Sequence, residues 1–281
     1  MIPPELSASN SFSLAAVFSW GTSDFLGGYA ARRTNAFLLT AIAHLSGMLL
    51  VAGVALATHS VFPSRTAVAW ALLGGLSGGG ALAIFYRALA TGRMGLTAPV
   101  AAVLGAAIPT AFGMFRDGLP QAAQVAGFLL AGIGIWLISR SEDDSPPEGI
   151  GMAALAGIGF AGFYLCMKQA GGGSAFWLAA VSKVASFTLT GVIVLIGPGV
   201  RAIDRRGIAF GMLAGCLDVI GSVLFIRASQ TGRLDAAVVL SSLYPAVTVL
   251  LARLVIKEHF TRWKAVGMVV ALIAVPMIAW R

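Results

Sequence analysis

The sequence predicts an all-α, polytopic membrane protein, in which ten transmembrane helices form two inverted five-helix repeats around a central cavity. Three observations predict this fold. Hydrophobic residues make up 58% of the 281 residues and charged residues only 11%, whereas a soluble domain is about 45 to 50% apolar. The apolar residues gather in runs of about 20, the length that crosses a bilayer. The two halves of the chain also share motifs in one common register.

The apolar runs predict ten spans joined by short connections. Their approximate ranges are 11–31, 36–57, 66–90, 95–115 and 121–139, then 149–169, 174–196, 207–230, 234–255 and 263–280. The first run has no basic residue before it and no small-residue cleavage site, so we interpret it as a retained span rather than a signal peptide. Only RSEDDSPPEG, at 140–149, is polar enough to be a linker.

An internal repeat relates the two halves. FYRALATGR, at 85–93, overlies FIRASQTGR, at 225–233, when the sequence is shifted by 140 positions. We therefore predict a first five-helix unit at 1–140, a polar linker at 141–148 and a second unit at 149–281. An odd number of spans makes the second unit enter the membrane from the opposite side, and inverted repeats of this kind place a binding site near the midplane.

The charges fit a membrane protein better than a nucleic-acid-binding protein. The net charge is +8, but the arginines stand at the ends of apolar runs. Connections after odd-numbered spans hold about twice as many Lys and Arg as the others, so the positive-inside rule predicts that both termini face outward. Cys166 and Cys216 lie in apolar segments without a CxxC spacing. We interpret them as small buried hydrophobes, with neither a disulfide nor a metal site.

Four ionisable residues lie deep in the spans: Asp24, His44, Lys183 and Asp218. Asp24 and His44 are equally far from the first connection, and Lys183 and Asp218 are nearly equally far from the seventh, which lies between 196 and 207. At about 1.5 Å of rise per residue, each pair would be level across a hairpin. Two interpretations stay open: structural ion pairs, or at least one aspartate that opens to a cavity and meets substrate or a proton.

Aromatic residues near Asp24 favour a binding role for this carboxylate. Trp20 lies one helical turn before Asp24 and shares its face, and a carboxylate with an indole is a suitable seat for an ammonium group. Tyr164 is the repeat counterpart of Asp24 and, with Phe163, would form an apolar, hydrogen-bonding wall. Packing against lipid or core is the alternative for each aromatic residue. His44 is either a buried histidine or a proton relay.

Glycines and prolines mark special points on the helices. The cluster of Gly74, Gly75, Gly78, Gly79 and Gly80 permits close helix packing or bending at a gate, and close packing is the safer interpretation. The prolines at 99, 109 and 245 remove backbone hydrogen bonds and predict kinks in the fourth and ninth spans.

One segment carries a family resemblance. TGRLDAAVVLSSLYPAVTVLLARLVIKEHFT, followed by VGMVVALIAV, resembles the closing part of the EamA-type repeat. Two such repeats resemble the bacterial drug/metabolite transporter superfamily over essentially the whole chain. The most specific parts are LYP at 243–245 and KE at 257–258, whereas the first half has DG at 117–118 and lacks the glutamate. The resemblance implies an exporter or exchanger of small metabolites, a cavity lined by spans one, three, four, six, eight and nine, and cytoplasmic termini.

Together, these observations predict an alternating-access transporter rather than an enzyme. Its expected cargo is a small amine-bearing or amphipathic metabolite, such as an amino acid or a drug-like organic cation. We expect no cofactor, metal or nucleic acid, a multi-pass location in the inner (plasma) membrane, and a substrate and the lipid bilayer as partners; a homo-oligomer and proton coupling are left open. The expected substrate-binding residues are Trp20, Asp24, Tyr86, Phe163, Tyr164, Lys183, Asp218, Ser241, Ser242 and Tyr244, and the candidate proton carriers are Asp24 and His44.

Two other functions are alternatives. A translocator of lipids or lipid-linked sugars would need a lateral opening. An intramembrane aspartyl protease would need two acids that share a proton, but TSDF and CLDV lack the G-x-G-D setting of that class. Each aspartate also has a candidate basic partner, which argues against a proteolytic pair.

Overall fold

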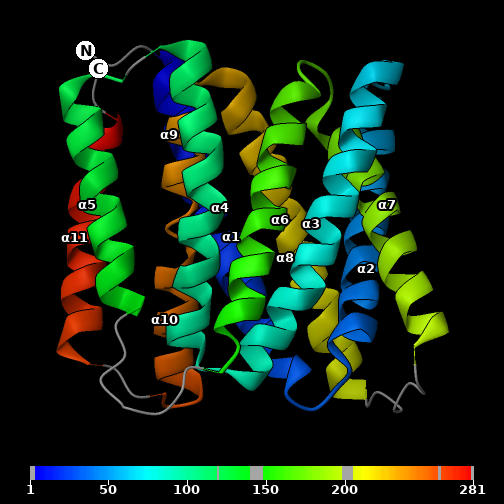
Figure 1. The fold of residues 1–281 in the computed structure, drawn as a ribbon. Helices are drawn as coiled ribbons and strands as arrows, with labels where there is room; N and C mark the ends of the chain where they lie inside the picture. Colours follow the sequence, from blue (N-terminus) through cyan, green and yellow to red (C-terminus); the bar gives the residue numbers. More distant parts are fainter. Residues whose placement is uncertain (1–3, 119, 140–147, 198–204, 259–260, 280–281) are drawn as a thin grey trace.

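The computed structural model describes residues 4–118, 120–139, 148–197, 205–258 and 261–279 (Figure 1). Within these ranges the chain consists of helices and short connections, without a strand. The helices are α1 (Pro4–Ala31), α2 (Ala36–Ala57), α3 (Arg65–Thr91), α4 (Met94–Asp117), α5 (Ala122–Ser139), α6 (Ile150–Gln169), α7 (Ala175–Ile196), α8 (Arg205–Thr231), α9 (Leu234–Ser241), α10 (Tyr244–Val255) and α11 (Arg262–Ala279). All ten predicted helices are present, the ninth as two segments. The predicted linker falls mainly on 140–147, outside the described residues.

The helices have the length and composition of membrane spans. Among the described residues, seven helical segments are long and apolar enough to cross a bilayer, and α9 and α10 together form one of them. In α5 a shorter apolar stretch covers Ala122–Gly134. The prediction of an all-α membrane protein is therefore confirmed, whereas ten crossings and an inverted duplication remain predictions.

Polar residues at the connections start several of these helices. The Asn35 side-chain oxygen accepts the backbone N–H groups of Phe37 at 2.9 Å and Leu38 at 3.2 Å, and so caps α2. Ser64 caps α3 and Ser174 caps α7 in the same way. Such caps satisfy N–H groups that have no partner inside the helix, and they fix where each span begins.

The ninth span is broken, which differs from the single helix predicted for 234–255. α9 ends at Ser241 and α10 begins at Tyr244, with Pro245 in its first turn. Because proline has no N–H, it cannot continue the hydrogen bonds of α9. The helix α4, in contrast, stays continuous although it contains Pro99 and Pro109.

Helices of the two halves alternate in space. α1 packs along α8, α3 packs along α6, and α2 packs along α7, while α5 and α11 pack on each other at one edge (Figure 1). α1 runs from the top of the view to the bottom, and α6 runs from bottom to top. α3 and α8 also begin and end 140 positions apart. These relations support the predicted register between the halves.

Glycines bring the helices around the centre into backbone contact. A Cβ atom on Gly75 of α3 would lie 2.0 Å from the carbonyl oxygen of Ser182 on α7. At the position 140 residues later, a Cβ atom on Gly215 of α8 would lie 1.9 Å from the carbonyl oxygen of Ala43 on α2. Close packing is therefore the interpretation of these glycines that the structure supports, and it holds α7 beside the centre of the bundle.

Candidate functional site

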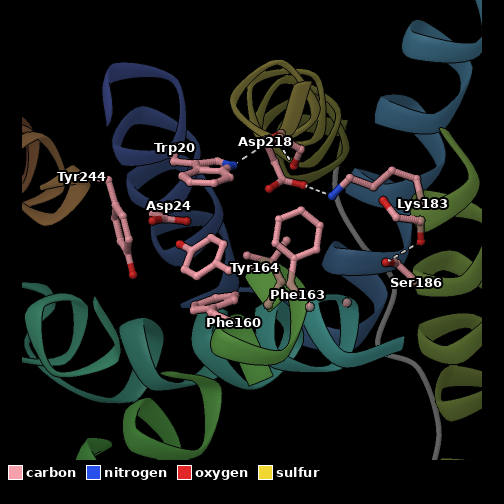
Figure 2. Close-up of a pocket in the computed structure, with 14 residues that line it drawn as sticks. Trp20, Asp24, Phe160, Phe163, Tyr164, Lys183, Ser186, Asp218 and Tyr244 are labelled. Carbon is pink, nitrogen blue, oxygen red and sulfur yellow. Dashed lines mark hydrogen bonds and ion pairs between the residues drawn. The ribbon is translucent and has the colours of Figure 1, made fainter. Parts of the chain in front are cut away.

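A cavity lies at the middle of the bundle and contains about 510 Å³ of space between atoms (Figure 2). This space includes a part that is open to solvent. Helices α1, α3, α6, α7, α8 and α10 line it. Seven of the predicted site residues are on its wall: Trp20, Asp24, Phe163, Tyr164, Lys183, Asp218 and Tyr244.

An ion pair forms one wall of the cavity. The Lys183 ammonium on α7 donates to the Asp218 carboxylate on α8, and both residues are more than nine-tenths buried. The pairing predicted from their depth is therefore confirmed. The backbone carbonyl of Asp218 accepts the indole N–H of Trp20 at 3.1 Å and the hydroxyl of Ser222 at 2.9 Å. These bonds hold α1, α7 and α8 together at the level of the cavity.

Asp24 lies on the opposite wall, and its carboxylate is unpaired within the described part of the chain. The residue is 5% exposed, and no described residue forms a hydrogen bond or ion pair with it. Figure 2 shows Asp24 between Trp20, Tyr164 and Tyr244. With both aspartates ionised, Asp24, Asp218 and Lys183 give the cavity one net negative charge. A site with this charge attracts a cation.

Aromatic rings surround the unpaired carboxylate. The ring centre of Trp20 lies 5.9 Å from that of Tyr164 and 6.5 Å from that of Tyr244. Phe163 extends this wall, with its ring centre 5.8 Å from Tyr164. Because α1, α6 and α10 each supply part of this group, the wall exists only when both halves of the chain are assembled.

Tyr86 is near the cavity but does not line it. The side chain is fully buried, and its hydroxyl lies 3.2 Å from the Ser23 hydroxyl. Ser23 in turn donates to the carbonyl of Ala214 at 2.8 Å. The ring lies against Gly27, where a Cβ atom would be 2.1 Å from the ring. Tyr86 therefore joins α1, α3 and α8 behind the wall, and a direct contact with a ligand stays a prediction.

His44 does not pair with Asp24, so the pairing predicted from the first hairpin was wrong. Depth alone did not place these residues together, because α1 packs mainly along α8 and α2 mainly along α7. His44 is fully buried, and neither of its ring nitrogens has a hydrogen-bond partner among the described residues. Because α2 packs along α7, the histidine lies on the helix next to the one that carries Lys183.

The broken ninth span supplies buried hydroxyl groups. Ser241 and Ser242 are at most 1% exposed and lie at the break between α9 and α10, behind the cavity wall. The hydroxyls of Ser241 and Tyr244 have no hydrogen-bond partner among the described residues. Tyr244 lines the cavity. The hydroxyl groups at this end of the site therefore have hydrogen-bonding capacity that no described residue satisfies.

The sequence interpretation missed part of α7. Ser182 and Ser186 line the cavity on either side of Lys183, and Phe160 adds to the wall from α6. The polar residues of α7 recur four positions apart, which places them on one helix face, and this spacing was a usable signal. The family resemblance implied that span four lines the cavity, but within the described residues α7 takes that place. No cluster there has three potential metal ligands among His, Cys, Asp and Glu.

Comparisons with known proteins agree with this architecture. A solved structure described as "Crystal structure of protein" superposes with a TM-score of 0.74 over 96% of both chains, at 19% identity. At this identity the likeness shows a shared fold alone. A curated relative, uncharacterized protein MJ1333.1 of Methanocaldococcus jannaschii, is 29% identical over 99 residues, which are 35% of this chain and 72% of the relative.

The second half of the chain also matches a protein family. Residues 147–280 match the EamA-like transporter family. This range starts at the predicted linker and contains α6 to α11, so it supplies Lys183, Asp218 and Tyr244 to the cavity. The resemblance to an EamA-type repeat that the sequence predicted is therefore confirmed for residues 147–280.

Proposed function

We propose that the protein exports or exchanges small amine-bearing or amphipathic metabolites, such as amino acids or drug-like organic cations, by alternating access. The family that residues 147–280 match consists of transporters of small molecules. The observation that carries the proposal is the buried Asp24 carboxylate, which faces a central cavity and has no partner among the described residues. An acidic residue inside a membrane span is costly unless a ligand, proton or cavity compensates it.

Asp24 and the neighbouring rings form the seat for the ammonium group of the cargo. The carboxylate supplies charge, and Trp20, Tyr164 and Tyr244 supply ring faces that attract cations. Such a seat accepts primary and substituted amines, because attraction to a ring face needs no hydrogen bond. Phe163 adds apolar surface for the remainder of an amphipathic molecule.

Lys183 and Asp218 hold the second polar group of the cargo. Each of the two neutralises the other, so a ligand carboxylate or amine competes with an existing partner. The pair would therefore open when a charged group arrives and close when it leaves. On the far side, Tyr244 supplies a hydroxyl group for a hydrogen-bonding end of the cargo, and Ser241 and Ser242 lie behind it as candidate contacts.

Proton coupling, if present, uses Asp24 as the carrier. A proton and an ammonium group would compete for this carboxylate, because its ionised form attracts both. His44 acts separately, through Lys183, since it lies beside α7 and does not pair with Asp24. Protonation of His44 would place a second positive charge near Lys183 and so alter the strength of the Lys183–Asp218 ion pair.

The arrangement of helices supports alternating access, and the membrane that we propose for it is the cell inner membrane. α1 and α6 run in opposite directions, and the cavity lies where helices of both halves meet. Rocking of one half against the other would expose the cavity to each side in turn. The positive-inside rule favours external termini and the resemblance favours cytoplasmic ones; a reporter fused to the N-terminus distinguishes these orientations.

The test is binding and flux with purified protein. A thermal-shift screen against amino acids, polyamines and quaternary ammonium compounds identifies the cargo class, because a ligand of the native state raises its stability. The best ligand is then followed into liposomes as a radiolabelled tracer. Asp24→Asn should retain the fold and abolish or uncouple saturable uptake. Equal flux by the wild type and Asp24→Asn would remove Asp24 from the mechanism.

A further inference from the structure

The C-terminal end of α8 is held by polar side chains from two other helices. Ser9 of α1 donates its hydroxyl to the carbonyl of Ala228 at 2.9 Å. The ammonium of Lys168, near the end of α6, donates to the carbonyls of Ser229 at 2.8 Å and Gly232 at 3.4 Å. These carbonyls belong to the last turn of α8 and to the residue after it, where a helix has no N–H groups of its own to offer.

A third contact ties the same end of α8 to the connection between α6 and α7. The Gln230 amide donates to the carbonyls of Gly171 and Gly173, each at 3.1 Å. We call Ser9, Lys168 and Gln230 the α8 clamp. The clamp lies on the face where α1 begins and α8 ends, at the top of Figure 1.

On the opposite face, the repeat counterparts of these three residues have no polar side chain. The positions 140 residues away from Ser9, Lys168 and Gln230 hold Gly149, Gly28 and Ala90. They surround the C-terminal end of α3, which corresponds to the end of α8. Gly149 occupies the place at the end of α3 that Ser9 occupies at the end of α8. A Cβ atom on Gly149 would lie 2.9 Å from the carbonyl oxygen of Ala88, and Ala88 is the counterpart of Ala228.

The ends of α3 and α8 are therefore held by different contacts, although the Glu258 carboxylate accepts the backbone N–H of Gly95 at 3.0 Å close to the end of α3. At the end of α3, Gly28 packs so closely that a Cβ atom there would lie 2.7 Å from Cβ of Leu89. That contact is steric and apolar. At the end of α8 the corresponding closure includes a charged donor, and charge-assisted hydrogen bonds are roughly twice as strong as neutral ones.

We propose that the α8 clamp is the gate of the face on which α1 begins, with Lys168 as its principal residue. The proposal rests on the proposed alternating-access function. Opening this face separates α1 and α6 from the end of α8, which breaks the clamp, whereas Gly149, Gly28 and Ala90 have no side-chain donor to lose at the end of α3. Lys168 acts as a positioning residue: it bonds to the backbone of α8 and does not line the cavity. The gate therefore favours closure of this face in the empty protein.

Hydrogen–deuterium exchange of the full chain in nanodiscs tests the gate without knowledge of the cargo. Peptides that cover 224–232 report on the end of α8, and peptides that cover 84–92 report on the end of α3. Loss of a hydrogen bond to a charged group corresponds to about ten-fold or more in a local opening equilibrium. We expect Lys168→Ala to raise exchange in 224–232 by this factor, Gln230→Ala by less, and neither to change 84–92.

Arg227→Ala is the matched control, because Arg227 is an exposed cation near the same end of α8. The hydrogen exchange of Arg227→Ala should equal that of the wild type. Lys168→Arg should keep part of the protection that Lys168→Ala loses. If Lys168→Ala matches the control, or if both helix ends become equally exposed, the gate proposal is overturned. Should Lys168→Ala fail to accumulate, Gln230→Ala and Lys168→Arg give the same comparison. If the protein shows no transport but its hydrogen exchange changes as expected, the proposed function is contradicted and the α8 clamp is not.

Discussion

The indole N–H of Trp20 on α1 donates to the backbone carbonyl of Asp218 on α8, with 3.1 Å between nitrogen and oxygen. Trp20→Phe keeps a ring beside Asp24 but removes the donor, which should lower the free energy of unfolding by about 1 kcal/mol. Affinity for an organic ammonium ion should fall several-fold, since indole is the better cation–π partner. Unfolding curves and equilibrium binding measure these effects. Wild-type affinity in both Trp20→Phe and Trp20→Ala would contradict a role for this ring in binding.

The second prediction concerns the ion pair of Lys183 and Asp218. Lys183→Met leaves a buried carboxylate without its cation, and breaking such a pair typically costs about 3 to 5 kcal/mol. The double variant with Asp218→Asn should recover most of that loss, because no uncompensated charge remains. Thermal or denaturant unfolding in detergent provides the measurement. If Lys183→Met is as stable as the wild type, the pair does not contribute to stability.

Asp24→Asn is the matched comparison for stability. Like Asp218→Asn, it removes a carboxylate from the cavity, but this carboxylate belongs to a residue without a partner in the described part of the chain. We therefore expect its free energy of unfolding to equal or exceed that of the wild type. The two aspartates should thus differ in their effects: neutralising Asp24 should affect transport, whereas removing the Lys183 partner of Asp218 should affect the stability of the fold. A large loss of stability in Asp24→Asn would mean that its carboxylate has a structural partner.

The third prediction uses the glycine contacts between helices. Gly215→Val places a side chain against the carbonyl of Ala43, where a Cβ atom alone would lie 1.9 Å away. α2 and α8 must then separate, so we expect a loss of several kcal/mol or failure to accumulate; overpacking alone costs about 1 to 3 kcal/mol. Gly191→Ala on α7 is the control, since nothing lies within 4 Å of its Cβ position. It should be neutral or stabilising by up to about 1 kcal/mol.

The fourth prediction tests the hydroxyls at the break in the ninth span. Ser241 is fully buried, and its hydroxyl has no partner among the described residues. Removing an unsatisfied polar group relieves a cost of about 1 to 3 kcal/mol, so Ser241→Ala should be at least as stable as the wild type. If the proposed binding role of Ser241 holds, transport should nevertheless become slower or its KM higher, because the cargo loses a hydrogen-bond partner. Faster transport with a lower KM would count against this subsite.

The sequence predicted the helices well because hydrophobic run length is set by the bilayer and does not depend on tertiary contacts. The pairing of Lys183 with Asp218 was also predictable, since two opposite charges at one depth in a membrane have few other ways to lower their free energy. The break between α9 and α10 was predicted only as a kink at Pro245. Proline interrupts hydrogen bonds wherever it occurs, but α4 tolerates two prolines within one helix, so local sequence did not decide between a bend and a break.

The position of a residue around its helix was the main quantity that the sequence could not give. Spacing along a hairpin placed Asp24 and His44 at one depth, but it did not indicate which neighbours each helix faces. Tyr86 shows the same limit, because its ring lies against Gly27 behind the cavity wall rather than on it. Such details depend on which helices pair across the two halves, and those pairs are far apart in the sequence.

The pairing of α5 with α11 at one edge has a consequence for how the protein can change over evolutionary time. Neither helix contributes a lining residue to the described cavity, and each finds its main partner in the other. Substitutions there can follow the thickness and composition of the surrounding lipid without altering the chemistry at the centre. The outermost pair can thus adapt the protein to its host membrane while the six lining helices retain cargo selectivity.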